Sequence, residues 1–448
     1  MEDFRTNKPI PSPAIPIQLK KEQYAELGNG IKVIVVENHK LPRITVQLII
    51  DRGIECEAPI TGIESMTGQL LAYGNQKNTK FDWDAKIDFL GGIVRTSSQG
   101  GHASALKKHF AQVFELFSDA ILFPSFNIED FDNLRRKYLS NIQSQKSDPD
   151  AILSSLTKKV IFPESHPYSE VITEESIKSI QLDNCIEWHA THFLPNASYL
   201  LFEGDITLEE AKDLSQRYFG KWEKKVLNLK SYPNNASKDS FDVSFVEKPG
   251  SVQSLISIGF AVDIKPYSKD MVAVNVMNTL LGGFFSSRLN LNLRESKGYT
   301  YGIQSTLKTD EYLGYFTTSA NVRNEVTSEA LNQIIAEINR LRNEIVGEDE
   351  LQMVKNVVAG NFSRSIENPL TIVKFAFAKK KFNLPSDYFE NQIMYIQSVT
   401  SDDIIRVANK YLLADSLHIM VVGSPEVIEK LQSFGKVNLY DYQGGIIN

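Results

Sequence analysis

The sequence has few cysteines, no long apolar run and no surplus of positive charge. Its 448 residues include only Cys56 and Cys185, so no disulfide framework holds the fold together. The two could form one bridge, but isolated buried thiols are favoured because unpaired cysteine packs as a small apolar residue. Acidic residues outnumber basic ones, 55 to 48. The net charge of −7 argues against binding to nucleic acid or to an anionic membrane.

Segments that direct a chain to or across a membrane are also missing. No stretch reaches the roughly 18 apolar residues of a transmembrane helix. The first 30 residues lack the apolar segment of a signal peptide, and residues 1–19 are predicted to form an extended, proline-rich arm. Two locations stay open: cytoplasmic, or periplasmic or secreted if a signal peptide was removed.

Several catalytic motifs are absent as well. There is no phosphate-binding GxxxxGK[ST] or GxGxxG loop, no CxxC pair and no GxSxG, so nucleotide and serine-hydrolase sites are unsupported. His189 and His192 share one face of a predicted helix and could ligate a metal. No glutamate stands between them to act as a base, so a histidine pair without metal is the favoured interpretation.

An internal repeat is the most informative feature that is present. THFLPNASYLLFEGD (191–205) and NKYLLADSLHIMVVGS (409–424) each follow a helical segment and contain an apolar run of strand length. After the glycine in each, a new helix is indicated. Thr207 and Glu210 form a capping box in the first copy, and Ser424 with Pro425 starts the helix in the second.

The repeat extends to the beginning of each half. ITVQLIIDRG (44–53) and LISIGFAVDI (255–264) both read as strands. The copies lie about 218 residues apart, close to half the chain. We therefore predict a first domain at 20–225, a polar linker at 226–244 centred on Pro233, and a second domain at 245–448.

The order of elements within each half indicates the fold class. Strands follow one another, as in GIKVIVVEN and RITVQLIID, and helical patterns then cluster. This order favours an α+β fold in which each half is a mainly antiparallel sheet packed with helices. Two apolar helix stripes are assigned to core packing. They comprise Phe131, Leu134, Tyr138 and Ile142, and Leu331, Ile334, Ile335, Ile338 and Leu341.

Two tandem α+β halves joined by a polar linker resemble the pitrilysin/insulinase family of zinc peptidases, in which the halves close like a clam. In active members the first helix carries HxxEH. Here that segment reads GIESMTGQLLAYG (62–74), so the two zinc histidines fall on Ser65 and Gln69 and the general-base glutamate on Gly68. The third zinc ligand, a glutamate in a later helix, falls on Asn141, or on Ser140 if the register slips by one.

These replacements imply that this chain binds no catalytic zinc. Zinc sites need imidazole, thiolate or carboxylate ligands, and a metal-bound water needs a base nearby. Ser65, Gln69 and Asn141 offer only neutral groups, and Gly68 has no side chain. Glu64 cannot substitute, because it projects about 100° round the helix from Ser65.

The second half keeps another family signature. LRESKGYTY contains Arg294 and Tyr301, seven residues apart, as in the family pattern LRExxGxxY. The resemblance implies that the tyrosine donates to the substrate carbonyl and that the arginine orients the peptide or the tyrosine. Residues 90–98 resemble the family's substrate-pairing edge strand, but Arg95-Thr96 replace its Asn-Ala.

A degenerate zinc site beside a retained Arg/Tyr pair suggests the non-catalytic subunit of a heterodimeric zinc metalloendopeptidase. The expected partner is a homologous HxxEH subunit that holds the zinc, and the expected substrate is a peptide or unfolded protein. Arg294 and Tyr301 would act in trans. The alternatives are a scaffold or core-type assembly protein and a peptide-binding pseudo-peptidase without catalysis. Whether the isolated chain forms a homodimer stays open.

Overall fold

The computed structural model describes residues 17–227, 229–232, 242–413 and 416–447. Most of the predicted arm at 1–19 and the linker centre at 233–241, with Pro233, lie outside these residues. The second copy of the repeat is described except for 414–415. The predicted domain boundaries stay a prediction. Strand β9 begins at Asp242, inside the range assigned to the linker.

The first half contains a six-stranded sheet in the order β1-β2-β8-β3-β7-β6. All neighbours are antiparallel except β2 and β8, which are parallel. A separate small hairpin pairs β4 (Gly74–Asn75) with β5 (Asn78–Thr79). The strands of the main sheet are β1 Gln23–Glu26, β2 Lys32–Glu37, β3 Arg43–Ile50, β6 Ile93–Ser97, β7 Gly100–Leu106 and β8 Ser198–Gly204.

The second half repeats this sheet in the order β11-β12-β10-β13-β9-β14. The predicted repeat strands occupy matching places. Strand β8 pairs with β3 in the first sheet, and β13 pairs with β10 in the second. The predicted α+β fold of two halves is confirmed. The strands are β9 Asp242–Glu247, β10 Gln253–Val262, β11 Ile303–Lys308, β12 Gly314–Arg323, β13 His418–Gly423 and β14 Lys436–Tyr440.

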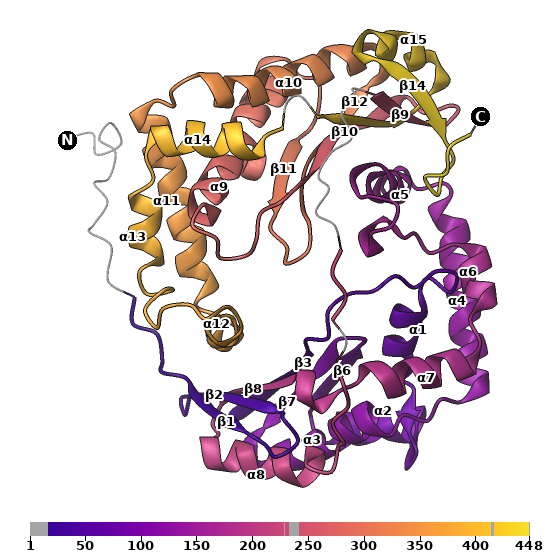
Figure 1. The fold of residues 1–448 in the computed structure, drawn as a ribbon, viewed down its shortest axis with the longest axis vertical. Helices are drawn as coiled ribbons and strands as arrows, with labels where there is room; N and C mark the ends of the chain where they lie inside the picture. Colours follow the sequence, from indigo (N-terminus) through magenta and orange to yellow (C-terminus); the bar gives the residue numbers. More distant parts are fainter. Residues whose placement is uncertain (1–16, 228, 233–241, 414–415, 448) are drawn as a thin grey trace, which may run out of the picture.

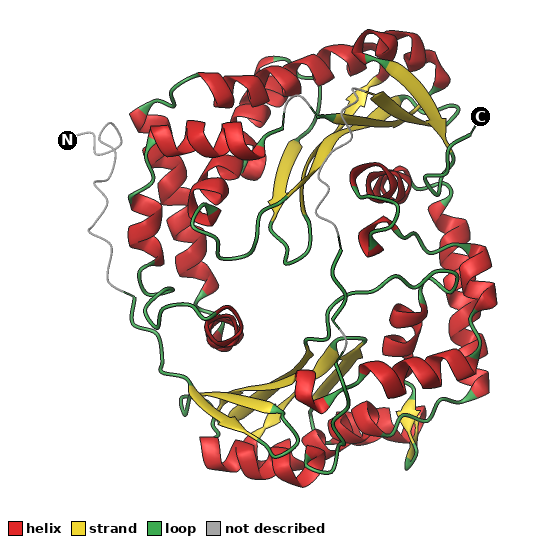
Figure 2. Ribbon diagram, in the orientation of Figure 1, coloured by secondary structure: helices red, strands yellow, loops and turns green. Residues whose placement is uncertain are grey.

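Helices cover the outer face of each sheet (Figure 2) and build its main core. The predicted stripes lie on α4 and α10, and most of their residues are buried. The capping box of Thr207 and Glu210 starts α8, whereas Ser424 and Pro425 start only a short 3₁₀ turn before α15. In the first half the helices are α1 Ile63–Leu70, α2 Lys80–Phe89, α3 Lys107–Leu122, α4 Ile128–Gln145, α5 Pro149–Ile161, α6 Glu174–Ser179, α7 Leu182–His192 and α8 Leu208–Phe219. In the second half they are α9 Met271–Asn278, α10 Thr327–Asn343, α11 Glu348–Ser365, α12 Pro369–Phe382, α13 Gln392–Gln397, α14 Ser401–Tyr411 and α15 Ile428–Leu431.

The two halves are joined by a reciprocal exchange of helices (Figure 1). Helix α5 of the first half packs on β10 and β13 of the second, and α12 of the second half packs on β2 and β8 of the first. Leu156 of α5 and Val373 of α12 are completely buried in these contacts. Each half therefore covers part of the other's inner sheet face with apolar side chains, which favours a fixed arrangement of the two.

Two expectations about composition can be compared with the structure. Cys56 and Cys185 are unpaired, as favoured, and Cys185 is buried. The expectation of two buried thiols is wrong for Cys56, which is exposed because the segment that carries it runs over the surface between β3 and α1. In the described ranges no helix combines the length and apolar character needed to span a membrane.

We expect Leu156→Ala to lower the free energy of unfolding by about 2–5 kcal/mol, because it removes buried contacts and leaves a cavity between the halves. Urea unfolding followed by circular dichroism measures the effect. Leu41→Ala, at a side chain that is 68% exposed, is the control and should change stability little. Equal effects of the two substitutions would show that the α5 contact does not stabilise the protein.

Candidate functional site

Helix α1 carries three of the four positions predicted to be a degenerate zinc site, and its N-terminus is held by Glu57. The Glu57 carboxylate accepts hydrogen bonds from the backbone amides of Gly62 (2.6 Å) and Glu64 (3.1 Å). A negative charge here stabilises the positive end of the helix dipole. Burial nonetheless raises the pKa of Glu57 to about 7. Ile63, Met66 and Leu70 anchor the opposite face of the helix in the core.

Ser65 and Gln69 are brought together by a third residue, Tyr138 of α4. The Tyr138 hydroxyl lies 2.6 Å from Ser65 Oγ, and Gln69 Nε2 donates to it over 2.6 Å. Burial raises the pKa of Tyr138, so the hydroxyl keeps its proton. The prediction that Tyr138 belongs to the core stripe does not include this role. Its position three residues before Asn141, on nearly the same helix face, was the available signal.

Asn141 does not join this cluster. Its side chain is exposed on α4, and so is that of Ser140. No hydrogen bond links Asn141 to Ser65 or Gln69 among the residues that the structure describes. The four positions therefore contribute one hydrogen-bonded group of Ser65, Tyr138 and Gln69, with Asn141 apart from it.

Gly68 lies too close to strand β6 to be replaced by a larger residue. A Cβ atom at Gly68 would stand 2.2 Å from the backbone nitrogen of Ser98 and 2.8 Å from the carbonyl carbon of Ser97. Thr96 Oγ1 also donates to the Gly68 carbonyl over 3.4 Å. Helix α1 thus packs directly against backbone at the end of the strand, and a base cannot be placed at this position without moving one of them.

Glu64, the nearest carboxylate on α1, already has partners. It accepts a hydrogen bond from Ser98 Oγ (2.8 Å) and forms an ion pair with Arg52 (3.0 Å). Arg52 is itself buried and lies over the Trp188 ring, 4.7 Å from its centroid. Glu64 therefore serves to join α1, β6 and the segment after β3.

The residues at these positions do not fit zinc. A hydroxyl, an amide and a phenol are neutral, whereas zinc sites use imidazole, thiolate or carboxylate. In the part of the chain that the structure describes, no three or more His, Cys, Asp or Glu residues are grouped so as to hold a metal. His189 and His192 point to different partners: His189 Nε2 lies 2.8 Å from the Ile121 carbonyl, and His192 bonds Glu55 and stacks on Trp188.

Strand β6 (Ile93–Ser97) forms an edge of the first sheet, where the family resemblance places substrate pairing. Arg95 and Ser97 are exposed, and Val94 and Thr96 are half-buried. Its outer end meets α1 at Ser97 and Ser98. An edge strand offers free main-chain groups to a peptide whatever its side chains are.

Arg294 and Tyr301 lie at the surface of the second half. Arg294 belongs to a π-helical turn, Asn290–Ser296, and Gly298 follows it with a φ of +62°. Its guanidinium lies 4.1 Å from the centre of the Phe285 ring, and 3.5 Å separates it from Glu295. Phe285 is 66% exposed. The cationic group is therefore presented to solvent on an aromatic support.

Tyr301 is 94% exposed and so has almost no contact within this chain. It lies in the loop before β11, which begins at Ile303. The loop base is fixed because Asn290 donates to the Ile303 carbonyl (2.9 Å) and accepts from the Ile303 amide (3.1 Å). The hydroxyl is thus displayed on an ordered base and does not reach α1 of the same chain.

Comparison with known proteins places this fold in a family. The model "Peptidase M16 inactive domain" matches residues 179–358. An uncharacterized zinc protease of Bacillus subtilis, YmxG, is 22% identical over 76% of this chain and 83% of its own length. The non-peptidase homolog YmxG of Helicobacter pylori is 21% identical over 61% of this chain and 64% of its own. A Pseudomonas fluorescens peptidase M16 inactive domain superposes with a TM-score of 0.82 at 22% identity, covering 90% of this chain and 98% of that one.

These similarities support the family recognised from the sequence, the peptidase M16 family of pitrilysin and insulinase. Within it, this is a non-catalytic pseudo-peptidase. The side chains around α1 give a physical reason, since they offer neither a ligand set for zinc nor room for a base.

Tyr138→Phe is expected to lower the free energy of unfolding by about 1 kcal/mol, because Ser65 and Gln69 both lose their hydrogen-bond partner while the ring stays in place. Chemical denaturation measures this loss. Tyr301→Phe makes the same chemical change at an exposed position and should stay within about 0.5 kcal/mol of wild type. A Tyr138→Phe protein as stable as wild type would contradict the described role of the hydroxyl.

Gly68→Ala should destabilise the protein by about 1–3 kcal/mol, because the methyl group overlaps the backbone of β6. Gly360→Ala on α11 is the matched control, since a Cβ there meets nothing within 4 Å. In the control, alanine should instead add up to about 1 kcal/mol through its better helix propensity. Thermal unfolding compares the two. Stabilisation by both substitutions would disprove the close approach of α1 to β6.

Proposed function

We propose that this chain is the non-catalytic subunit of a heterodimeric zinc metalloendopeptidase, paired with an M16 subunit that carries HxxEH. The observation that carries the proposal is the 94% exposure of Tyr301. A tyrosine on an ordered loop, without a hydrogen bond to any residue that the structure describes, is suited to a surface contributed by another chain. The degenerate positions on α1 explain why that other chain is needed.

In this proposal Arg294 and Tyr301 act at the partner's active site. The Tyr301 hydroxyl donates a hydrogen bond to the carbonyl oxygen of the scissile peptide bond, and Arg294 orients the peptide or the tyrosine. A donor aimed at an oxygen that gains negative charge stabilises the transition state, by roughly 3–4 kcal/mol for a single donor. The zinc is the partner's, and no step on it is assigned to this chain.

Phe285 supports the positioning of Arg294 in this reading. An arginine on an exposed loop would lose side-chain entropy on binding a peptide, and stacking on Phe285 limits that loss beforehand. Glu295 lies on the same turn and neutralises part of the charge. The substrate class, a peptide or unfolded protein, follows from the family and from the main-chain groups that the edge strand β6 offers.

A second candidate is a scaffold or a peptide-binding pseudo-peptidase in which the pair has no chemical role. The observation that favours it is that Arg294 already has partners in its own chain, Phe285 and Glu295. Those contacts would account for Arg294 by its contribution to stability alone. The first candidate predicts that Arg294 and Tyr301 raise the rate of peptide cleavage, and the second predicts that they do not affect it.

We expect no peptide cleavage by the isolated chain and zinc-dependent cleavage when it is mixed with an HxxEH homologue from the same organism. In the mixture, Tyr301→Phe should reduce kcat by about 10²–10³, because one donor to the reacting carbonyl is lost. Fluorogenic peptide hydrolysis measures this. Tyr395→Phe, on α13, is the control and should leave kcat unchanged. Full activity of the Tyr301→Phe mixture would leave only the second candidate.

A further inference from the structure

The segment that leads into β11 differs from its counterpart in the first half. Strands β6 and β11 occupy the same edge of their sheets. In the first half, Gly91 turns the chain after α2 with a φ of +61°, and β6 begins at Ile93. In the second half, Gly298 turns the chain with a φ of +62°, but β11 begins only at Ile303. The connection between glycine and strand is therefore longer in the second half, and Tyr301 lies in it.

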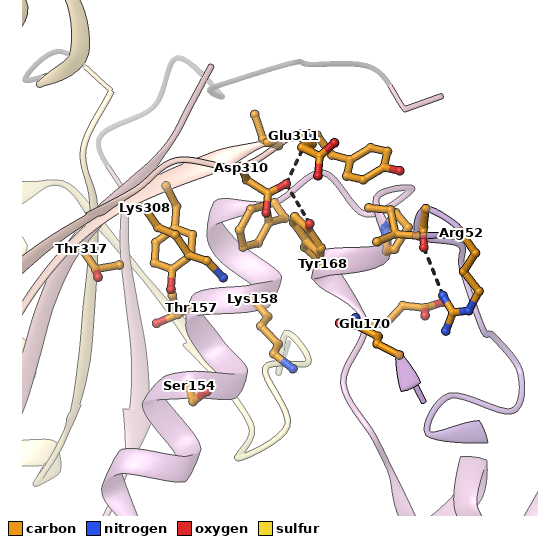
Figure 3. Close-up of a pocket in the computed structure, with 18 of the residues that line it drawn as sticks. Arg52, Ser154, Thr157, Lys158, Tyr168, Glu170, Lys308, Asp310, Glu311 and Thr317 are labelled. Atoms are coloured by element: carbon orange, nitrogen blue, oxygen red, sulfur yellow. Dashed lines mark hydrogen bonds between the residues drawn. The ribbon is translucent and has the colours of Figure 1, made fainter. Parts of the chain in front are cut away.

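The strand that follows this connection is fixed at its far end. Its pairing with β12 runs from Ile303 to Lys308. In the turn between the two strands, Asp310 accepts hydrogen bonds from the Tyr168 hydroxyl of the first half (2.8 Å) and from the Tyr312 amide (2.9 Å). Figure 3 shows this turn at a cavity between the halves. Strand β11 is thus a fixed base for the residues that precede it.

A single side chain fixes the near end of β11. Asn290, the first residue of the π-helical turn, is buried, with 7% of its surface exposed. Its Nδ2 donates to the Ile303 carbonyl (2.9 Å), and its Oδ1 accepts from the Ile303 amide (3.1 Å). A neighbouring strand would make the same pair of bonds to an edge residue. The Asn290 amide therefore takes the place of a strand where the Tyr301 connection ends.

The same side chain also reaches the start of the segment. Asn290 Nδ2 lies 3.2 Å from the Phe284 carbonyl and 3.2 Å from Ser287 Oγ. Phe285, the ring that supports Arg294, directly follows Phe284. One buried amide thus joins the two ends of the segment that displays the arginine and the tyrosine.

Other polar side chains hold the π-helical turn itself. Arg288 forms two hydrogen bonds to Glu350 of α11 (2.8 and 2.7 Å), and Asn292 donates to the buried Glu337 of α10 (2.7 Å). Turns of this kind are rare and are frequent at functional sites. Of these three anchors, only Asn290 bonds β11 in the part of the chain that the structure describes.

The position of Tyr301 therefore depends on the base of its connection. The side chain is 94% exposed, so its own contacts cannot hold it. A group that must meet a reacting carbonyl has to be placed closely, because a displacement of about 1 Å can slow a reaction by roughly 10². The bonds of Asn290 to both ends of the segment supply this placement.

We propose that Asn290 is a positioning residue for Tyr301. It holds the connection so that the hydroxyl stands where the partner's substrate can meet it, a role that rests on the proposed function. Asn290 acts through Ile303 and Phe284 and contacts neither substrate nor zinc. It should therefore affect the rate of cleavage more than the affinity for peptide.

Hydrogen–deuterium exchange of the isolated chain, followed by mass spectrometry, tests the placement without a partner. Asn290→Ala should speed exchange within residues 299–303 about tenfold or more, because the Ile303 amide loses its acceptor. Asn290→Asp keeps the shape and the acceptor but loses the donors, so it should speed exchange less. Asn75→Ala is the control. It removes a buried asparagine that accepts from the Lys77 and Asn78 amides in the first half, and it should leave exchange at 299–303 unchanged.

Turnover in the mixture with the HxxEH homologue tests the action through Tyr301. Asn290→Ala should lower kcat about 10- to 10²-fold and change KM by less than about twofold. The loss should disappear when Tyr301→Phe is already present, because a positioning residue acts only through the group that it positions. General destabilisation would instead lower kcat by the same factor in both backgrounds. Asn75→Ala should keep the wild-type kcat.

Three results would overturn the proposal, and they differ from one another. Unchanged exchange at 299–303 in both Asn290 variants removes the placement and leaves the proposed function intact. An equal loss of kcat with and without the Tyr301 hydroxyl shows that Asn290 does not act through it. Full activity of the Tyr301→Phe mixture removes the proposed function itself, and faster exchange in the Asn290 variants would then assign Asn290 to stability alone.

Discussion

The contact between helix α1 and strand β6 is the constraint on which the functional interpretation depends. Gly68 lies against the backbone of Ser97 and Ser98 at a distance that leaves no room for a Cβ atom. The same helix is tied on another side by the Tyr138 hydroxyl, which occupies both Ser65 and Gln69. Packing and hydrogen bonding here take the place of metal coordination. The segment predicted to be a degenerate zinc site thus connects α1 to α4 and to the end of β6.

The internal repeat shows how the two halves have diverged around a common plan. Their sheets have matching strand orders through five of six places, and each half lends one helix to the other's inner sheet face. Against this shared frame, the first half has a packed, neutral cluster where the second half presents an exposed arginine and tyrosine. The proposed pairing with another chain rests on this contrast.

Much of the fold could be predicted from the sequence because the repeat consists of local hydrophobic patterns. Alternating and 3.6-residue periodicities located β3, β8, β10, β13, α4 and α10. The exchange of α5 and α12 could not be predicted, since an apolar helix stripe does not say which sheet it covers. The same limit applies to Cys56, which a composition-based argument placed inside the protein.

At the candidate site, the sequence identified the positions but not their contacts. Aligning Ser65, Gly68 and Gln69 with a family motif shows which ligands are missing. It does not show that Tyr138 fills the space, because a tyrosine in an apolar stripe reads as core. Nor does a spacing of seven residues show that Tyr301 is exposed. Both facts depend on tertiary distances between segments far apart in the chain.

Zinc binding by the isolated protein tests the central claim most directly. The purified chain would be incubated with excess zinc, dialysed and analysed by mass spectrometry for metal per chain. Because hydroxyl, amide and phenol groups are poor zinc ligands, we expect far less than one zinc per chain. One tightly held zinc per chain, lost on replacing Ser65 and Gln69 by alanine, would contradict it.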